Sequence, residues 1–278
     1  MARLPRIERR LTESFDLRSV RNFSDERMVR YVKVGGVRSL GVRDVVKIKN
    51  TTFANCSFAQ QVFKGLVFQN CNFYNCVFNG SIFLECEFHD CAIVESVFFK
   101  TVFEMCYIDP RSFVFRDRVW LKNYANVNAW LYWGLYKNSK TMHQEKFAML
   151  ADRKFRLSKR YEYLYGRKPD YLRFFKGLVY DWGLGSGYGI VNSIVVTLLI
   201  LSLFSFFMFE RVKESGGSGV NGVLEVIYYS VVSFTTVGYG DYLPIKDQIA
   251  LSVTMIFLLL SVIWGAIVTA IVVKRIVR

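Results

Sequence analysis

Residues 235–241 read Thr-Thr-Val-Gly-Tyr-Gly-Asp and follow the apolar segment 222–234, GVLEVIYYSVVSF. A helix needs about 20 residues to cross a hydrocarbon core of about 30 Å, so this segment is too short to span a membrane. We interpret it as a re-entrant helix that Asn221 caps. Non-helical backbone at membrane depth is tolerated only where it is buried in protein or lines water. Residues 235–241 are therefore expected either to be buried in protein or to line a water-filled space.

Two uncharged runs flank this stretch. Residues 190–209 have the length of one membrane-spanning helix, and residues 249–273 are long enough to span with some tilt. Most Lys and Arg residues come before residue 190, and a second basic group follows the last run: Lys274, Arg275 and Arg278. The positive-inside rule then predicts a cell (inner) membrane protein with both termini in the cytoplasm.

The order of span, half-helix, T-T-V-G-Y-G-D and span resembles the pore of two-helix potassium channels over residues 186–278. The resemblance implies a homotetramer with transmembrane helices at 190–209 and 249–273, a pore helix at 222–234 and a selectivity filter at 236–240. It also implies that K⁺ ions bind in the filter, without an organic cofactor, on main-chain oxygens of Thr236, Val237, Gly238 and Tyr239, with the Thr236 hydroxyl completing the innermost site.

Glycine permits backbone angles that other residues avoid, which explains why Gly238 and Gly240 stand in the expected filter. By resemblance, the residues that support the filter are Thr235, Asp241, Tyr228 and Tyr229, and the Tyr239 ring packs near one of the last two. One position departs from the pattern: many bacterial relatives have Glu where this chain has Val232. A carboxyl pair with Asp241 is then absent, which concerns inactivation of the filter rather than its selectivity.

The second span repeats small residues at Ser261, Gly265 and Thr269. This spacing fits close packing between helices. It also fits a face that lines a water-filled cavity, with Gly265 as a hinge and a narrow gate near the cytoplasmic mouth. The gate candidates are Val268, Thr269, Val272 and Val273. The first span carries no positive charge, so voltage sensing of the usual kind is not expected.

The first half of the chain has a period of five residues. Large apolar residues recur thirteen times from Phe53 to Phe113, and all six cysteines lie two positions before such a residue. Neither a helix nor a flat strand has this period, so the chain is expected to turn once per repeat and stack on itself as a solenoid. Residues 46–115 resemble the pentapeptide-repeat family, which implies a right-handed, four-sided β-helix of about three coils.

On that geometry the cysteines stack one coil apart as small buried rungs, in the pairs Cys56 and Cys76, Cys71 and Cys91, and Cys86 and Cys106. Cytosolic thiols stay reduced, so no structural disulfides are expected. Residues 1–45 are expected to cap one end of the solenoid. Residues 116–185 are expected to form amphipathic helices, broken at Pro169.

The last of these helices carries Arg173 and Lys176 beside aromatic residues, which suits a helix lying among anionic lipid headgroups. A soluble helical linker packed on the solenoid remains the alternative. The sequence Gly187-Tyr188-Gly189 repeats part of the filter motif, but it lacks the threonines and a preceding half-helix, and we interpret it as an interfacial turn.

Overall, the sequence predicts a mixed fold: a β-helix, a helical linker and an all-α membrane pore. The net charge of +14 leaves nucleic-acid binding as a minor alternative. An enzyme is not expected, because the two histidines are scattered and no phosphate-binding loop or nucleophile motif occurs. The solenoid is expected to regulate the pore or to bind an unknown cytoplasmic partner. A pure scaffold, with the pore reduced to a membrane anchor, is the competing function.

Overall fold

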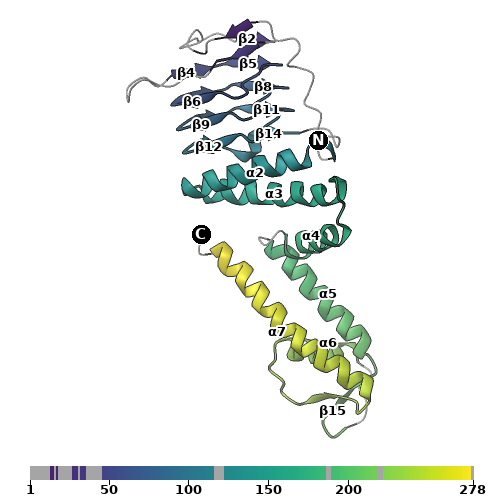
Figure 1. Cartoon of the computed structure of the whole chain (residues 1–278). Coiled ribbons are helices and arrows are strands. Elements are labelled where there is room, and N and C mark those ends of the chain that lie inside the picture. The colour runs from purple at the N-terminus through teal and green to yellow at the C-terminus, as the bar shows by residue number, and fades with distance from the viewer. Residues whose placement is uncertain are drawn as a thin grey trace. The chain divides into compact units, whose positions relative to one another are not determined.

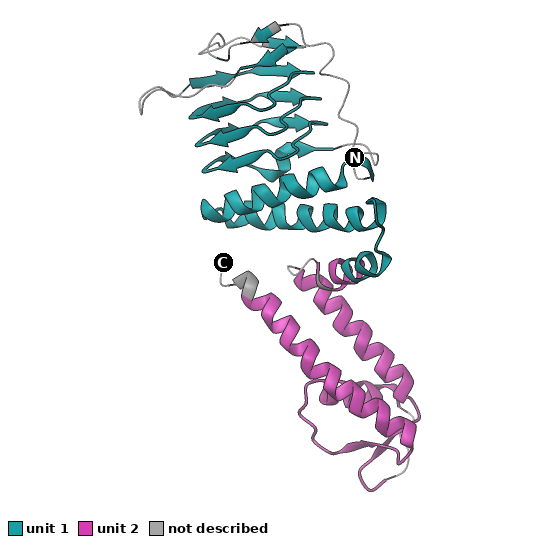
Figure 2. Cartoon of the chain, viewed as in Figure 1, with its two compact units in different colours: residues 1–177 teal, residues 178–278 magenta. Residues whose placement is uncertain are grey.

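A computed structural model of the chain divides into two compact units, residues 1–177 and 178–278, each with its own hydrophobic core (Figure 2). The structure describes residues 13–15, 17, 27–30, 32–35, 46–115, 122–185, 189–217 and 222–276. Asn221, Gly187 and Tyr188 lie outside these ranges, and so do the side chains of the basic group at the carboxyl end.

The first unit is built on a parallel β-solenoid, which Figure 1 shows as a stack of short strands. Three sheets have the strand orders β13-β10-β7-β4, β14-β11-β8-β5-β2 and β12-β9-β6. A fourth row consists of isolated bridges that join Lys33, Ser57, Val77 and Val97. The four rows confirm the predicted four-sided solenoid.

The strands of the solenoid are β1 (Glu13–Phe15), β2 (Arg27–Arg30), β3 (Val32–Val34), β4 (Val46–Lys49), β5 (Thr51–Ala54), β6 (Val62–Lys64), β7 (Leu66–Gln69), β8 (Asn72–Tyr74), β9 (Ile82–Leu84), β10 (Glu87–His89), β11 (Ala92–Val94), β12 (Val102–Glu104), β13 (Tyr107–Ile108) and β14 (Phe113–Val114).

The corners of the solenoid explain the period of five. Positive φ angles recur two residues after each large apolar position from Ile48 to Phe103, for example at Asn50, Asn70 and Gly80. Asn and Gly adopt this left-handed conformation more readily than most residues. Two asparagine pairs also bond along the stack, because the Asn70 Nδ2 donates to Asn50 Oδ1 at 2.9 Å and the Asn75 Nδ2 donates to Asn55 Oδ1 at 2.7 Å.

The large apolar residues of the repeat fill the interior. Phenylalanine rings one coil apart stack on each other, as Phe58, Phe78 and Phe98 do at centroid distances of 4.6 and 4.5 Å. Rings on adjacent sides meet edge to face, as Phe53 and Phe58 do at 5.4 Å. Such aromatic pairs contribute about 0.5–1.5 kcal/mol each beyond burial. The repeat pattern is therefore the core of the first unit.

The six cysteines are free thiols, and all are buried in the solenoid. Their thiols donate to main-chain carbonyls of the preceding coil, as Cys76 does to the Phe53 oxygen at 3.4 Å and Cys106 to the Phe83 oxygen at 3.3 Å. Burial raises the pKa of Cys76 well above its usual range. The prediction of small buried rungs is confirmed.

The solenoid begins earlier than the repeat pattern indicates. Strand β2 pairs in parallel with β5 and puts Val29 beside Phe53, while Val34 and Leu17 are fully buried. The structure therefore has about four turns, and the expectation of about three is wrong. Val29 and Val34 are five residues apart, but they are out of phase with the series from Phe53 to Phe113 and have valine where most of the later repeats have phenylalanine.

The other end of the solenoid is covered by a helical hairpin, α2 (Ala125–Thr141) and α3 (Glu145–Tyr165), which follows the short 3₁₀ turn η3 (Pro110–Ser112). Leu131 and Leu135 of α2 are buried in the same cluster as the phenylalanine interior. A covered end protects strands that would otherwise expose unpaired main-chain groups.

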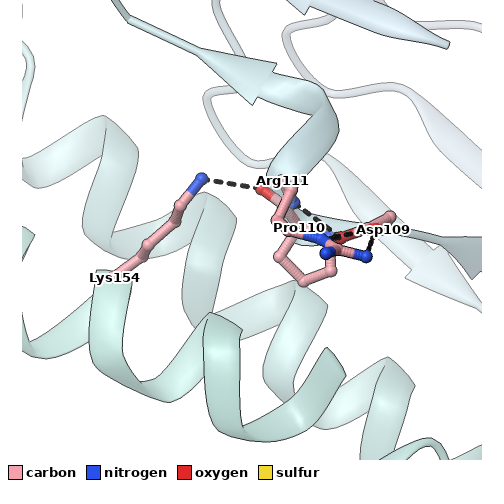
Figure 3. A network of polar contacts seen from close by, with 4 residues as sticks. All are labelled: Asp109, Pro110, Arg111 and Lys154. Atoms are coloured by element: carbon pink, nitrogen blue, oxygen red, sulfur yellow. Dashed lines mark hydrogen bonds and ion pairs between the residues drawn. The ribbon is translucent and has the colours of Figure 1, made fainter. Parts of the chain in front are cut away.

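Lys154 of α3 binds the last coil, as Figure 3 shows. Its Nζ donates to the carbonyl of Pro110 at 2.8 Å and to that of Phe113 at 3.3 Å. The Asp109 carboxylate accepts the Arg111 main-chain N–H at 2.8 Å and pairs with the Arg111 guanidinium, which closes the same turn. Burial lowers the pKa of Lys154. One buried amino group thus holds α3 to the corner where the solenoid ends.

Helix α4 (Tyr171–Leu184) follows the predicted break at Pro169. Arg173 and Lys176 are exposed on it, and Arg173 Nε lies 3.1 Å from the Asp170 carboxylate. Large apolar side chains are exposed on the same helix: Tyr171, Leu172, Phe175, Val179 and Trp182. The helix therefore combines basic and apolar groups on its surface.

The second unit contains α5 (Ile190–Met208), the short helix α6 (Val223–Phe234) and α7 (Gln248–Ile276). Strand β15 (Val212–Glu214), which follows α5, pairs in antiparallel with β16 (Tyr242–Pro244), which precedes α7. Helices α5 and α7 are long and apolar enough to cross a membrane, and only 11% and 17% of their apolar windows are buried. Core helices of soluble proteins are mostly buried, so these two are not of that kind. The predicted mixed fold class is confirmed.

Candidate functional site

The stretch 235–241 begins where α6 ends. The Thr235 hydroxyl donates to the Val231 carbonyl at 2.9 Å. The next two main-chain N–H groups also turn back: Thr236 donates to the Ser233 carbonyl at 3.1 Å and Val237 to that of Val232 at 3.2 Å. These bonds fix the first residues of the stretch to the carboxyl end of the short helix.

The backbone beyond this point alternates in handedness. Thr236, Gly238 and Gly240 have φ angles of 59°, 57° and 79°, whereas Val237 and Tyr239 do not have positive φ. Alternating left-handed and right-handed residues turn successive carbonyls toward one side of the chain. A row of carbonyl oxygens of this kind can replace the water around a cation.

The two glycines have room around them in the single chain. A Cβ atom added to Gly238 or Gly240 would meet no heavy atom within 4 Å. The demand for glycine is therefore conformational, since a left-handed angle costs other residues about 1–2 kcal/mol. Val237 and Tyr239 are also open to the outside, with 52% and 71% of their surface exposed.

Tyr228 and Tyr229 of α6 contact opposite parts of the second unit. Tyr228 lies beside the Asp241 side chain, and its ring meets that of Tyr242 edge to face at 5.6 Å. Tyr229 stacks on Phe204 of α5 at 6.1 Å. The structure thus brings both Asp241 and Tyr242 to Tyr228.

A hollow of about 530 Å³ lies behind this stretch. Its lining combines the stretch itself with residues of α6 and α7, among them Val232, Ser233, Thr236, Leu258, Leu259 and Val262. Val232 supplies an apolar wall at the position where the resemblance leads one to expect a carboxyl group.

The small residues of α7 do not share one environment. Ser261 is buried and its hydroxyl donates to the Leu258 carbonyl, while Thr269 is exposed and bonds the Gly265 carbonyl at 2.9 Å. A Cβ atom on Gly265 would meet nothing within 4 Å. The gate candidates Val268 and Val272 are half-buried, and Val273 is 51% exposed.

The sequence did not predict two contacts of this unit. The Trp264 indole, next to Gly265, donates to the Thr197 hydroxyl of α5 at 2.8 Å, although the two residues are far apart in the sequence. The second contact is the β15–β16 pair, whose strands have three residues each and show no readable alternation. Among the described residues, no three His, Cys, Asp or Glu side chains gather as a metal cluster.

The family comparison agrees with this geometry. A family model described as Ion channel matches residues 193–278. The match runs through α5, α6, the stretch 235–241 and α7, and it leaves the solenoid and helices α2 to α4 outside. A search of curated proteins finds no match.

Proposed function

Residues 193–278 form an ion-channel domain of the two-helix potassium-channel type, and on that premise we propose that this chain conducts K⁺ selectively and passively through a homotetrameric pore. The observation that carries the proposal is the alternating backbone of residues 236–240 directly after a short helix. That backbone can present a row of carbonyl oxygens to a dehydrated cation. The chemistry is permeation rather than catalysis.

In this proposal the main-chain oxygens of Thr236, Val237, Gly238 and Tyr239 coordinate K⁺, and the Thr236 hydroxyl completes the innermost site. Gly240 ends the row in a conformation that suits glycine. Two neighbouring residues support the row: the Thr235 hydroxyl donates to α6, and Asp241 lies beside Tyr228. The carboxyl end of α6 carries roughly half a negative charge, which favours a cation near it.

Four copies are needed because one chain cannot enclose an axis. The open hollow behind the filter and the apolar surface of α7 support this assembly, since both would be covered by neighbouring copies or by lipid. Exposed apolar side chains along α7 include Met255, Ile256, Leu259, Val262 and Ile263.

We propose that the amino and carboxyl termini lie on the cytoplasmic side of the cell membrane, because most basic residues come before α5 or at the carboxyl end of the chain. Helix α4 is then an interfacial helix. Its exposed apolar residues enter the headgroup boundary, and Arg173 and Lys176 meet anionic headgroups.

For the gate we propose that Gly265 is a hinge of α7, with the narrow part of the pore at Val268, Thr269 or Val272. Glycine weakens a helix at its own position. The solenoid is proposed to regulate this gate, and a binding surface for a cytoplasmic partner is the second function that its regular outer faces could serve.

Flux through purified full-length protein tests the proposal. K⁺ should flow down its concentration gradient out of liposomes that contain the unaltered channel. Gly240→Ala should lower that flux by more than about tenfold, because four left-handed alanines must be accommodated in one pore. Gly183→Ala is the matched control, since Gly183 lies in α4, has no positive φ, and has no neighbour within 4 Å of an added Cβ.

Flux that is absent from the unaltered protein, or equal in Gly240→Ala and Gly183→Ala, contradicts the proposal. In the first case the scaffold function becomes the better account. Chemical crosslinking of each sample checks that all three proteins have the same number of subunits.

A further inference from the structure

The strand that follows α5 runs alongside the strand that follows the filter. In the antiparallel β15–β16 pair, Lys213 lies opposite Leu243 and Glu214 lies opposite Tyr242. The pairing extends past the strands in both directions. The Ile245 N–H donates to the Arg211 carbonyl at 2.9 Å, and the Ser215 N–H donates to the Asp241 carbonyl at 2.7 Å.

The last of these bonds reaches the filter itself. Asp241 follows Gly240 directly, so the Ser215 N–H holds the main chain at the first residue beyond the proposed ion sites. The Asp241 side chain is engaged at the same time, because its Oδ1 accepts the Tyr242 N–H at 3.1 Å. The Ser215 N–H therefore holds the main chain of Asp241, and the Asp241 carboxylate lies beside Tyr228 of α6.

Strand β15 is itself anchored in the helices. The Val212 side chain is completely buried in a cluster with Phe204, Met208 and Val226. Next to it, the Arg211 guanidinium donates to the Phe207 carbonyl at 2.6 Å and lies 4.6 Å from the Phe207 ring. A strand held this way at its start can transmit rigidity from α5 to the residue that it pairs with.

We infer that residues 211–215 are a clamp that keeps the outer end of the filter in its conducting conformation, with the Ser215 N–H as the positioning group. The inference rests on the proposed potassium-channel function. Val232 has no carboxyl group to pair with Asp241, so this chain needs another restraint at the same place. The main-chain ladder from Arg211 to Ser215 supplies it.

Loss of the clamp should appear as a current that declines during sustained conduction. K⁺ bound at the outer sites requires the intact filter, so by linkage a higher external K⁺ concentration stabilises that conformation and slows the decline. A residue with a merely structural role would lower the amount of assembled channel without creating this K⁺ dependence.

The test compares Ser215→Pro with Ser215→Ala in full-length channels recorded in planar bilayers. Proline removes the main-chain N–H, whereas alanine keeps it and removes only the hydroxyl. We expect the current of Ser215→Pro to decline about fivefold faster, the effect of one main-chain hydrogen bond. The difference should shrink as external K⁺ is raised. Equal rates of decline in the two variants, in low external K⁺, overturn the clamp.

A cross-strand disulfide tests the clamp without proline. Lys213→Cys combined with Leu243→Cys joins register partners, and the oxidised channel should decline more slowly than the same channel after reduction. If Ser215→Pro does not assemble, this comparison decides alone, and equal rates before and after reduction overturn the clamp. Absence of K⁺ current from the unaltered channel contradicts the proposed function instead, so the two failures are distinguishable.

Discussion

Gly238 and Gly240 have ample space and positive φ angles, so what they contribute is conformation. Left-handed angles also recur once in every five residues at the corners of the solenoid, where Asn and Gly occupy about half of the positions. In both units, single residues with unusual backbone angles decide which way main-chain groups face.

The buried thiols give a prediction about pH. Burial raises the pKa of Cys76 above that of an unfolded cysteine, which is about 8.5. The stability that this thiol contributes is fully present below that value and is lost as the pH rises above it. In protein whose other five cysteines are replaced by serine, the ultraviolet absorbance of the Cys76 thiolate should therefore appear only together with loss of the circular dichroism of the folded chain. Thiolate absorbance in protein that keeps its folded spectrum would contradict this.

Lys154 gives a prediction about stability. Lys154→Met leaves the Pro110 and Phe113 carbonyls without their donor and should lower the free energy of unfolding by about 1–3 kcal/mol. Lys159→Met is the control, because Lys159 pairs with Glu162 at the surface and should matter by less than about 0.5 kcal/mol. Denaturant unfolding followed by tryptophan fluorescence measures both. Equal losses in the two variants would mean that Lys154 does not hold the last coil.

At the scale of elements, α7 is mostly apolar, and the Trp264–Thr197 hydrogen bond joins its middle to α5. Gly265 follows directly. A flexible residue beside a fixed one is a suitable place for a helix to bend, which supports the hinge interpretation over simple close packing.

Gly265→Ala tests that interpretation. The added methyl group meets no atom of the chain within 4 Å, and alanine stabilises a helix by about 1 kcal/mol relative to glycine. The open probability in single-channel recordings should fall, and Ala266→Gly, which loosens the next position, should raise it. An unchanged open probability in Gly265→Ala, together with weaker tetramers, would favour the packing interpretation.

The elements differ in how far the sequence predicts them. The sequence predicts the phenylalanine repeat because the repeat has a regular period. It predicts the motif at residues 235–241 because local backbone chemistry requires those residue types. Strands β15 and β16 were not predicted, since three residues show no period and their pairing joins segments on either side of α6. The first coil of the solenoid was missed for a related reason: Val29 pairs with Phe53 by register, but the two positions are not separated by a multiple of five residues.

At the scale of the whole molecule, the two units differ in where their apolar side chains lie. The solenoid forms its own core from stacked aromatic rings, while the second unit exposes apolar helices that need a membrane or other copies. The proposed regulation by the first unit has a covalent route through α4 and α5, the segments that connect the two units.

Deletion of residues 1–177 tests this division. The remaining unit should keep its preference for K⁺, because all proposed ion ligands belong to it, whereas its open probability should change. Recordings of the truncated and full-length channels under the same conditions measure both properties. An identical open probability would remove the regulatory role and favour a solenoid that only binds partners.

The most direct test of the central claim is the reversal potential of the reconstituted full-length channel with K⁺ on one side and Na⁺ on the other. A filter that replaces the water of K⁺ by carbonyl oxygens predicts a reversal potential close to that of a membrane permeable to K⁺ alone. A reversal potential near zero, with current carried equally by Na⁺, would contradict it.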